Sequence, residues 1–277
     1  MIENLEQSQI IFFSIIMIVA AIPVGFIAGL FGVGGGLIIV PVLFYIFNII
    51  GINPNFIMHL AVGTSFAIII PTSIMSTLTH IKFKAVDFNI VKSFGFFVVI
   101  GVILGTIFAT NLKTVTLILF FCIMTMFFSI YFLISKERTD FSPKKVHLFI
   151  KFISGFFSGF LSAPMGIGGG IINTPILRMF GYPINIAIGT SAALGFIIAL
   201  IATLGFVAAG NYLRIEAPLS FGFVNLPAFF IFVPITTFMA RLGAKTVHKV
   251  DKKIIGKLFG IFLFIISCRL FFVFLYF

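Results

Sequence analysis

The sequence predicts an all-α polytopic membrane protein, built from two inverted repeats of about five hydrophobic segments each. Three observations lead to this fold class: an apolar composition, a series of long apolar stretches, and a Gly-rich motif that occurs twice. Each repeat is expected to contain a pair of short, Gly-rich broken or re-entrant helices. The two pairs are expected to meet near the midplane of the bilayer.

The composition excludes a soluble fold. Hydrophobic residues make up 61% of the 277 residues and charged residues 9%, whereas soluble domains have ~45–50% and ~25%. So few charges cannot cover so much apolar surface in water, and lipid must be the solvent for most of the chain. Cys122 and Cys268 lie inside apolar runs, which excludes a disulfide-stabilised secreted scaffold. The isolated Asp and Glu residues form no carboxylate-rich site, so no metal, cofactor or hydrolytic chemistry is expected.

Most of the apolar stretches have the ~20 residues that cross a bilayer as a helix. Two are shorter, because 36–50 would reach only ~22 Å and 170–180 only ~16 Å at 1.5 Å per residue. Both follow three consecutive glycines and contain a proline. Such interrupted segments at matching places in two halves are the best sequence indication of a transporter binding site. The ten stretches run over 10–31, 36–50, 56–79, 88–109, 114–134, 148–163, 170–180, 184–207, 218–240 and 254–276.

The two halves match at two motifs in the same order. Residues 25–43 align without gaps on 159–177, and Ala61-Val-Gly-Thr-Ser65 aligns on Ala187-Ile-Gly-Thr-Ser191. An internal duplication is therefore expected, with repeats over 1–135 and 148–277 joined by a cytoplasmic loop over 136–147. In the first motif, Gly25, Gly32, Gly34, Gly35, Gly36 and Pro41 fall on Gly159, Gly166, Gly168, Gly169, Gly170 and Pro175.

The positions of the basic residues predict the orientation and explain the net charge of +11 without a nucleic-acid partner. Of the 18 Lys and Arg residues, 15 lie in the loops after the third, fifth, seventh and ninth stretches. The positive-inside rule makes that side cytoplasmic and places both termini outside, in a multi-pass protein of the cell (inner) membrane. The first stretch is expected to be retained, because no secretory signal precedes it.

Two topologies stay open. All ten stretches could cross the bilayer, or stretches one and two and stretches six and seven could each enter and return as a V. The charge distribution is the same in both, although the shortness of 170–180 favours a V in the second half. In either topology each half crosses an odd number of times, so the halves are inverted relative to each other.

The paired Gly-rich turn is the strongest candidate for a site. Glycine lets backbone amides approach a ligand closely and adopt positive φ. Helices that begin at the third glycine would present unpaired N–H groups and a positive dipole end, which favour an anion. The alternative is that the glycines only permit packing or a bend, but two copies at short segments favour a site. The candidate residues are Gly34, Gly35, Gly36, Gly168, Gly169 and Gly170.

Hydroxyl and amide side chains are the second set of candidates. Hydroxyls can donate to an oxyanion without the cost of a buried charge, although they could equally form helix-to-helix hydrogen bonds. Asn173 could add an amide donor, and the corresponding residue of the first half, Ile39, is apolar, which would make the site asymmetric. The candidate hydroxyls are those of Thr64, Ser65, Thr190 and Ser191.

The ionisable residues restrict the coupling mechanism. His59 and His80 lie at the two ends of the third stretch, where they could titrate or simply sit at the membrane interface. No Asp or Glu lies in the middle of any stretch. A proton-driven carrier usually relays through an intramembrane carboxylate, so this chain would couple through histidine, through a protonated substrate, or not at all. The lack of an Asp-rich motif also argues against a lipid-diphosphate transferase, and no enzymatic activity is expected.

The doubled G-x-x-x-G-x-x-G-[VI]-G-G-G-x-x-x-x-P motif, followed by A-[VI]-G-T-S, resembles the TauE/SafE family of sulfite-exporter-like membrane permeases. The resemblance covers about residues 12–276. It implies an all-helical inner-membrane carrier for sulfur-containing anions such as sulfite, thiosulfate or organosulfonates, usually outward for sulfite. The second half departs from the motif at Ala163 and inserts Pro164, so the two halves are not expected to pack identically.

These observations lead to one mechanistic hypothesis. An oxyanion binds near the midplane between the two Gly-rich tips, backbone amides and hydroxyls replace its water, and the inverted halves rock to expose it alternately to each side. One alternative is a permease of the same fold that moves another organic anion. A second is a non-transporting scaffold subunit, for which the short loops offer little docking surface. The expected partners are the small anion and the lipid bilayer, and a homo-oligomer is compatible with the sequence.

Overall fold

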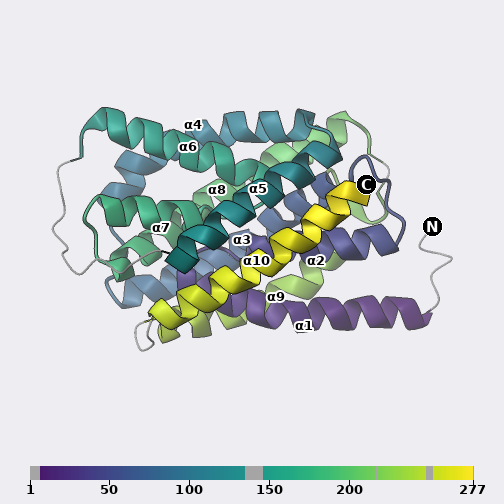
Figure 1. Cartoon of the computed structure of the whole chain (residues 1–277), viewed down its shortest axis with the longest axis horizontal. Helices are drawn as coiled ribbons and strands as arrows, with labels where there is room; N and C mark the ends of the chain where they lie inside the picture. The colour runs from purple at the N-terminus through teal and green to yellow at the C-terminus, as the bar shows by residue number, and fades with distance from the viewer. Residues whose placement is uncertain (1–6, 135–145, 216, 248–251, 277) are drawn as a thin grey trace.

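The computed structural model describes residues 7–134, 146–215, 217–247 and 252–276. These ranges are almost entirely helical, with one short antiparallel β ribbon. The elements in chain order are α1 (Gln7–Phe31), α2 (Gly36–Ile49), α3 (Ile57–Lys82), α4 (Phe88–Asn111), α5 (Thr114–Ile134), α6 (Leu148–Met165), α7 (Gly170–Met179), α8 (Ile184–Tyr212), β1 (Ser220–Phe221), β2 (Val224–Asn225), α9 (Leu226–Thr246) and α10 (Lys252–Tyr276) (Figure 1).

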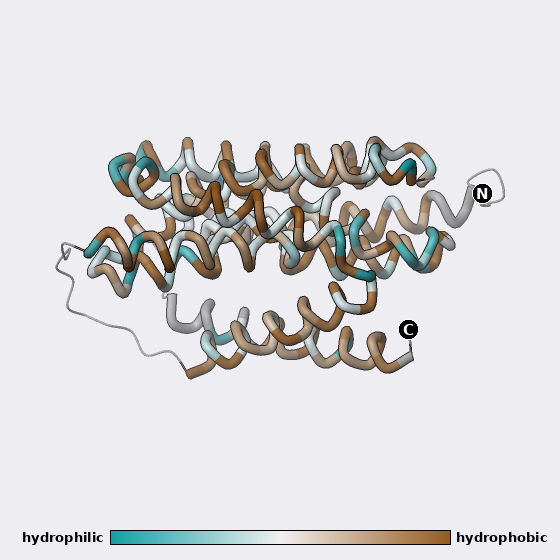
Figure 2. Tube along the Cα trace, turned by 90° about the horizontal axis from the view of Figure 1, so that it is seen from above, coloured by the Kyte–Doolittle hydropathy of each residue, from teal (hydrophilic) through white to brown (hydrophobic). Residues whose placement is uncertain are grey.

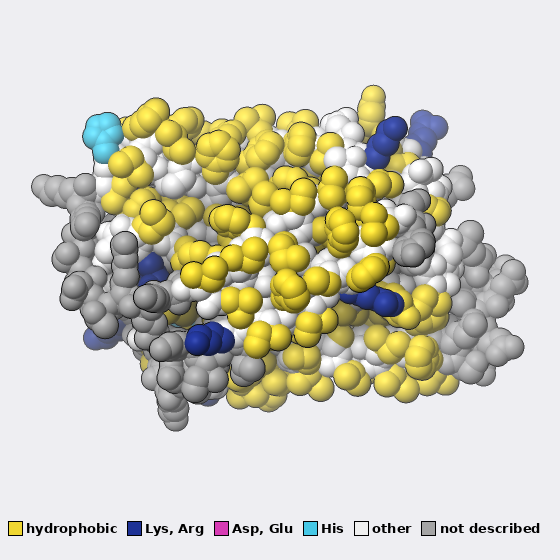
Figure 3. Space-filling model, in the orientation of Figure 1, with side chains coloured by type: hydrophobic (Ala, Val, Ile, Leu, Met, Phe, Trp, Pro, Cys, Tyr) yellow, Lys and Arg dark blue, Asp and Glu magenta, His cyan; other side chains and the backbone are white. Residues whose placement is uncertain are grey.

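The helices have the lengths and composition of a polytopic membrane protein, as the sequence predicts. Seven described helices, namely α1, α3, α4, α5, α6, α8 and α9, are long and apolar enough to cross a membrane. The helix α2 is shorter, and α7 has only 10 residues. Figure 2 shows hydrophilic residues gathered toward the two ends of the bundle, and Figure 3 shows a broad apolar surface with Lys and Arg toward its edges.

Each predicted apolar stretch corresponds to one helix, but the ninth stretch begins later than expected. It was expected to begin at residue 218, and the helix α9 starts only at Leu226. The β1–β2 ribbon takes up the intervening residues because Gly222, with φ of 55°, allows a tight turn. The side chain of Asn225 then caps α9 by accepting a hydrogen bond of 3.1 Å from the Ala228 amide.

Two helices form the centre of the bundle, and the long helices around them pack in pairs. The central helices α3 and α8 contact each other, and α3 is the most deeply buried of the seven. The helix α1 lies along α9, and α4 lies along α6. These two pairs are equivalent under the alignment of the halves, because α1 corresponds to α6 and α9 corresponds to α4.

The helices α5 and α10 form a separate pair across one face of the bundle (Figures 1 and 2). Two buried serines fix their contact. Ser129 Oγ donates to the Gly260 carbonyl at 2.8 Å, and Ser267 Oγ donates to the Cys122 carbonyl at 3.0 Å. Such interhelical hydrogen bonds stabilise helix packing where the surrounding solvent is lipid.

The short helices turn back along the helices that precede them, which favours the V-shaped topology over ten crossings. Ser158 Oγ of α6 donates to Asn173 Oδ1 of α7, so α7 runs back beside α6. In the first half, a Cβ atom at Gly35 would lie 2.7 Å from Val24 Cγ1 of α1. The 10 residues of α7 reach about 15 Å, half of the ~30 Å hydrocarbon core. Figure 1 shows α2 toward the end of the bundle where α1 starts and α10 ends, and α7 toward the opposite end.

Candidate functional site

The site is built on two turns that only glycine can form easily. In the first turn Gly32, Gly34 and Gly35 have φ of 66°, 77° and 85°, and in the second turn Gly166 and Gly169 have φ of 62° and 70°. Residues with a Cβ atom rarely adopt this left-handed region. The turns end α1 and α6 sharply and begin α2 and α7 within a few residues, as the spacing of the glycines predicts.

The two turns meet in the core, backbone against backbone. A Cβ atom at Gly36 would collide with the carbonyl of Gly166, and one at Gly170 would collide with the carbonyl of Gly32. The two contacts are equivalent, because the repeat alignment pairs Gly36 with Gly170 and Gly32 with Gly166. An anion cannot lie between these atoms while they touch.

A backbone hydrogen bond also joins the turns. The Gly168 amide donates to the Val33 carbonyl at 3.3 Å. A Cβ atom at Gly34 would lie 2.7 Å from Ile69 Cγ2 of α3, so the central helix covers the first turn. The six glycines predicted from the sequence as site residues therefore come together at one place.

Both short helices begin without a side-chain cap. Their N-cap residues are Gly35 and Gly169, and neither provides a capping side chain. The amides of the third and fourth residues after each cap donate back to the cap carbonyl. The amides at positions 36, 37, 170 and 171 find no acceptor among the described residues. These unpaired N–H groups and the positive ends of two helix dipoles favour a negatively charged ligand.

The threonines of the second motif hold the loops that lead into α9 and α4. Thr64 Oγ1 accepts from the Asn225 amide at 2.9 Å, and Thr190 Oγ1 accepts from the Asp87 amide at 3.0 Å. Asn225 and Asp87 are the N-caps of α9 and α4, so the two bonds are again equivalent. This contact corresponds to the helix-to-helix bonding that was the alternative interpretation of these hydroxyls. Each threonine keeps its own hydrogen to donate.

The serines of the same motif lie closer to the turns. Ser65 Oγ donates to the Gly166 carbonyl at 2.8 Å, which ties α3 to the tip of the second hairpin. Ser191 Oγ accepts from Thr174 Oγ1 of α7 at 3.0 Å. Both serines are completely buried, so they belong to the packed centre of the bundle.

Asn173 lies beside the second turn, together with two serines that the sequence analysis did not identify. Its Oδ1 atom accepts from Ser158 Oγ, and Ser162 Oγ donates to the Ser158 carbonyl at 2.6 Å. The three side chains are completely buried. The sequence does contain a signal for the serines, since they lie four residues apart on α6 and Ser162 aligns with Ala28.

The two histidine side chains are buried in the protein. That they lie at the level of the membrane interface stays a prediction. His59 stacks on the ring of Phe223 at 5.2 Å, and its Nε2 atom lies 2.9 Å from the Leu112 carbonyl. His80 is completely buried, with Nε2 3.3 Å from the Gly29 carbonyl of α1.

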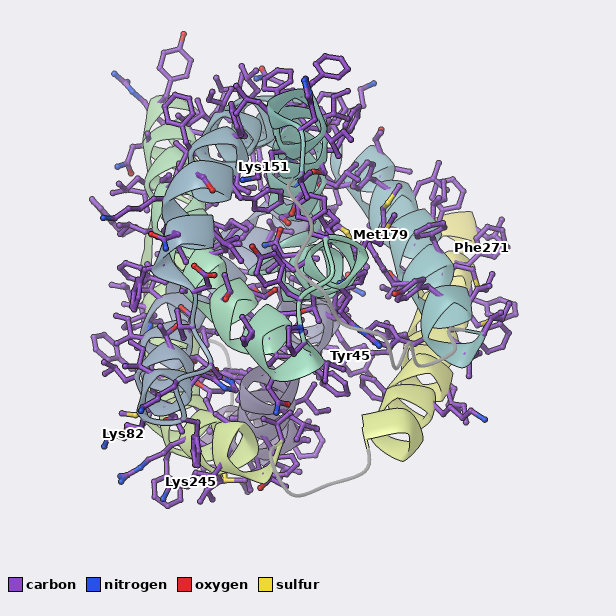
Figure 4. The ribbon with its side chains drawn as sticks, turned by 90° about the vertical axis from the view of Figure 1, so that its left-hand side faces the viewer. Tyr45, Lys82, Lys151, Met179, Lys245 and Phe271 are labelled. Carbon is purple, nitrogen blue, oxygen red and sulfur yellow. The ribbon has the colours of Figure 1, made fainter. Side chains whose placement is uncertain are left out.

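Charged groups stay at the ends of the bundle. Asp87 is the only carboxylate in the part of the chain that the structure describes, and no Lys or Arg there is buried. Lys82 and Lys245, labelled in Figure 4, point away from the helices. Partial burial and the nearby Asp87 raise the pKa of the Tyr182 phenol, which therefore stays neutral in the loop between α7 and α8. Because no Lys or Arg of the described residues is buried, the donors around the two turns are neutral backbone amides and neutral side chains.

The fold and this site define a polytopic membrane protein with two helix N-termini buried at its centre. The family described as Sulfite exporter TauE/SafE matches residues 16–270. The chain belongs to this family, as the resemblance of its doubled motif suggests, and is therefore a membrane transporter.

Relatives that match over nearly their whole length carry consistent names. A probable membrane transporter protein of Haemophilus influenzae is 30% identical over 247 residues, which cover 89% of this chain and 94% of that protein. Proteins with the same description from Methanocaldococcus jannaschii and Bacillus subtilis are 28% and 25% identical, and the matches cover 93% and 96% of those chains. No solved structure gives a significant match.

The contact between the turns predicts a graded effect of alanine. Gly36→Ala and Gly170→Ala place a Cβ atom on an opposing carbonyl, whereas the nearest atoms to a Cβ at Gly168 lie 3.2 Å away. Overpacking of about 1–3 kcal/mol lowers the melting temperature by about 3–10 °C. We expect this shift for the first two variants and a smaller shift for Gly168→Ala, measured on purified protein in detergent. Equal melting temperatures for all three would contradict the tight contact.

Proposed function

We propose that this protein carries a small sulfur-containing oxyanion (sulfite, thiosulfate or an organosulfonate) across the inner membrane by alternating access, with sulfite export as its activity. The observation that carries the proposal is the meeting of two uncapped helix N-termini in the core. Discontinuous helices whose N-termini face an anionic substrate at the midplane are a recurring transporter arrangement. The family description supplies the sulfur oxyanion.

Neutral donors suit a carrier that must release its substrate. A buried Lys or Arg would cost free energy in the empty state, and the described residues place no such group in the core. Amide and hydroxyl donors can replace part of the water around an oxyanion without adding a fixed charge. The proposed ligands are the turn residues Gly34–Gly36 and Gly168–Gly170, helped by Asn173 and the hydroxyls of Thr64, Thr190 and Ser191. Ser65 can join them only when its Oγ releases the Gly166 carbonyl, to which it donates in this structure.

The closed contact between the turns supports alternating access. While the turns touch, no anion fits between them, so binding and release require the halves to move apart. The reciprocal contacts of Gly36 with Gly166 and of Gly170 with Gly32 support an inverted repeat. The placement of α2 and α7 toward opposite ends of the bundle supports it as well. A rocking motion of the halves would open the site toward one side at a time.

A row of buried hydroxyls supports a route between the site and the cytoplasm. Thr72, Ser73, Ser76 and Thr79 lie along α3 and are all buried. Thr72 Oγ1 lies 3.0 Å from Thr236 Oγ1 of α9. The row leads from the turns toward the basic end of α3. The corresponding positions of α8 carry no hydroxyl and are Ile198, Ala199, Ala202 and Gly205.

The proposed activity predicts saturable sulfite flux in proteoliposomes that contain the purified protein. Thiosulfate or a short alkylsulfonate in excess should inhibit the flux, because the same donors would bind their oxygens. Imposed pH and electrical gradients would then show whether transport is coupled to protons or to charge. Because no carboxylate lies in the middle of an apolar stretch, a coupled proton would be carried by histidine or by the substrate. Flux of another organic anion alone would support the first alternative, and folded protein that moves no anion would support the scaffold subunit.

The proposed orientation predicts that both termini lie outside. In Figure 1 the start of α1 and the end of α10 lie at one end of the bundle, and the ends of α5 and α9 that precede basic loops lie at the other. The positive-inside rule then places the basic end in the cytoplasm. An alkaline phosphatase fused after Phe277 should be active, whereas a green fluorescent protein fused there should not fluoresce after export. The opposite pattern would reverse the orientation.

A further inference from the structure

The two hairpins differ at one matched place. The residues of α6 and α7 that line the inside of the second hairpin are Ser158, Ser162 and Asn173, and all three are completely buried. The corresponding residues of the first hairpin are all apolar and equally buried. They are Val24, Ala28 and Ile39. The fold therefore tolerates an entirely apolar lining at this place, so packing alone does not require the polar one.

The difference lies directly at the glycine that caps each short helix. A Cβ atom at Gly169 would lie 2.8 Å from Asn173 Nδ2 and 3.2 Å from Ser162 Oγ. A Cβ atom at Gly35 would instead lie 2.7 Å from Val24 Cγ1 and 3.5 Å from Ala28 Cβ. The N-terminus of α7 thus has two polar side chains beside it in addition to the Cδ1 methyl of Ile198, whereas the side chains beside the N-terminus of α2 are both apolar.

The amide of Asn173 has one half paired and one half unpaired. Its Oδ1 atom accepts from Ser158 Oγ, which fixes the plane of the amide. Its Nδ2 atom is buried and finds no acceptor in the described part of the chain. An unpaired buried donor costs about 1–3 kcal/mol, and native proteins rarely keep one without a reason.

The position of Asn173 on α7 explains where this donor points. It is the fourth residue of the helix, and helical side chains lean toward the N-terminus. Nδ2 therefore lies beside Gly169, next to the first turn of α7, where the amides of Gly170 and Ile171 also lack acceptors. A side-chain donor and a helix N-terminus converge at one place.

We propose that Asn173 Nδ2 is a direct ligand of an oxyanion oxygen and determines the affinity for the substrate. The second hairpin holds the anion with this amide and with the N-terminus of α7, while Ser162 Oγ stays bonded to the Ser158 carbonyl. The first hairpin, with methyl groups at the matched place, contributes closure instead of side-chain donors. Ser158 positions the amide. This inference rests on the proposed oxyanion transport and assigns its binding site mainly to one half of the protein.

The test compares Asn173→Leu with Ile39→Leu, which places the same side chain at the matched position of the other hairpin. Flux of sulfite, thiosulfate and methanesulfonate is measured in proteoliposomes, and KM and kcat are determined for each anion that moves. Loss of a hydrogen bond to a charged group raises KM by roughly tenfold to a hundredfold. We expect this rise for Asn173→Leu and a change of less than about twofold for Ile39→Leu, which removes no donor.

Asn173→Asp keeps the proposal testable if the leucine variant does not fold. The aspartate retains the acceptor for Ser158 but replaces the donor with an oxygen, so KM should rise at least as much as for Asn173→Leu. Ser158→Ala separates ligand from structure, because it breaks the bond between α6 and α7 and leaves the donor in place. It should raise KM less than either Asn173 variant.

Each outcome decides between the proposals. Wild-type protein that moves none of the three anions would overturn both the proposed function and this inference. Wild-type protein that moves one of them, with unchanged KM in Asn173→Leu and Asn173→Asp, would overturn this inference alone. An equal rise in KM for Ser158→Ala and both Asn173 variants would also overturn this inference. Asn173 would then only hold α7 against α6 and would not bind the anion.

Discussion

The contact between the two glycine turns is the constraint on which the rest of the structure depends. At Gly36 and Gly170 the backbone of one hairpin lies so close to the carbonyl of the other that no side chain fits between them. The left-handed φ angles in both turns reverse the chain within a few residues. The short helices can therefore begin at the centre of the bundle, where the central helices α3 and α8 cover them. The two helix ends with unpaired amides are thus kept inside the protein and away from lipid, which cannot satisfy them.

The same constraint determines how an anion is handled. Lysine and arginine stay out of the described core, and the positive potential at the centre comes from helix ends and neutral donors. Most of the neutral polar groups near the turns already form hydrogen bonds within the protein. The hydroxyls of the second motif bond to the amides of the N-cap residues, to a glycine carbonyl or to another hydroxyl. Among the described residues beside the two turns, the first amides of α2 and α7 and the Nδ2 atom of Asn173 have no acceptor. Binding energy for a ligand is available at these unpaired donors and at the positive helix ends.

Much of this arrangement could be predicted from the sequence, because its causes are local or periodic. The lengths of the apolar stretches predicted the helices. The repeated glycines predicted both turns and which turn residues of the two halves correspond. The hydrogen bond that Thr64 Oγ1 accepts could not be predicted from the sequence, since its donor, the Asn225 amide, is 161 residues away. The late start of α9 depends on a turn at Gly222 inside an otherwise apolar run. Ser158 was also missed, although it lies four residues before Ser162, because a serine in an apolar helix has the same pattern whether it bonds to its own helix or to Asn173.

The central claim is that the two turns must part for transport, and a reversible tether between them tests it most directly. The Gly168 amide donates to the Val33 carbonyl at 3.3 Å, so the two backbones are adjacent and cysteines at these positions are the pair to test for a disulfide. The background would carry Cys122→Ala and Cys268→Ala, with Val33→Cys alone as the control for the oxidant. The account predicts that the reduced double-cysteine protein carries sulfite, that oxidation stops the flux, and that reduction restores it. Undiminished flux in the oxidised protein would contradict it.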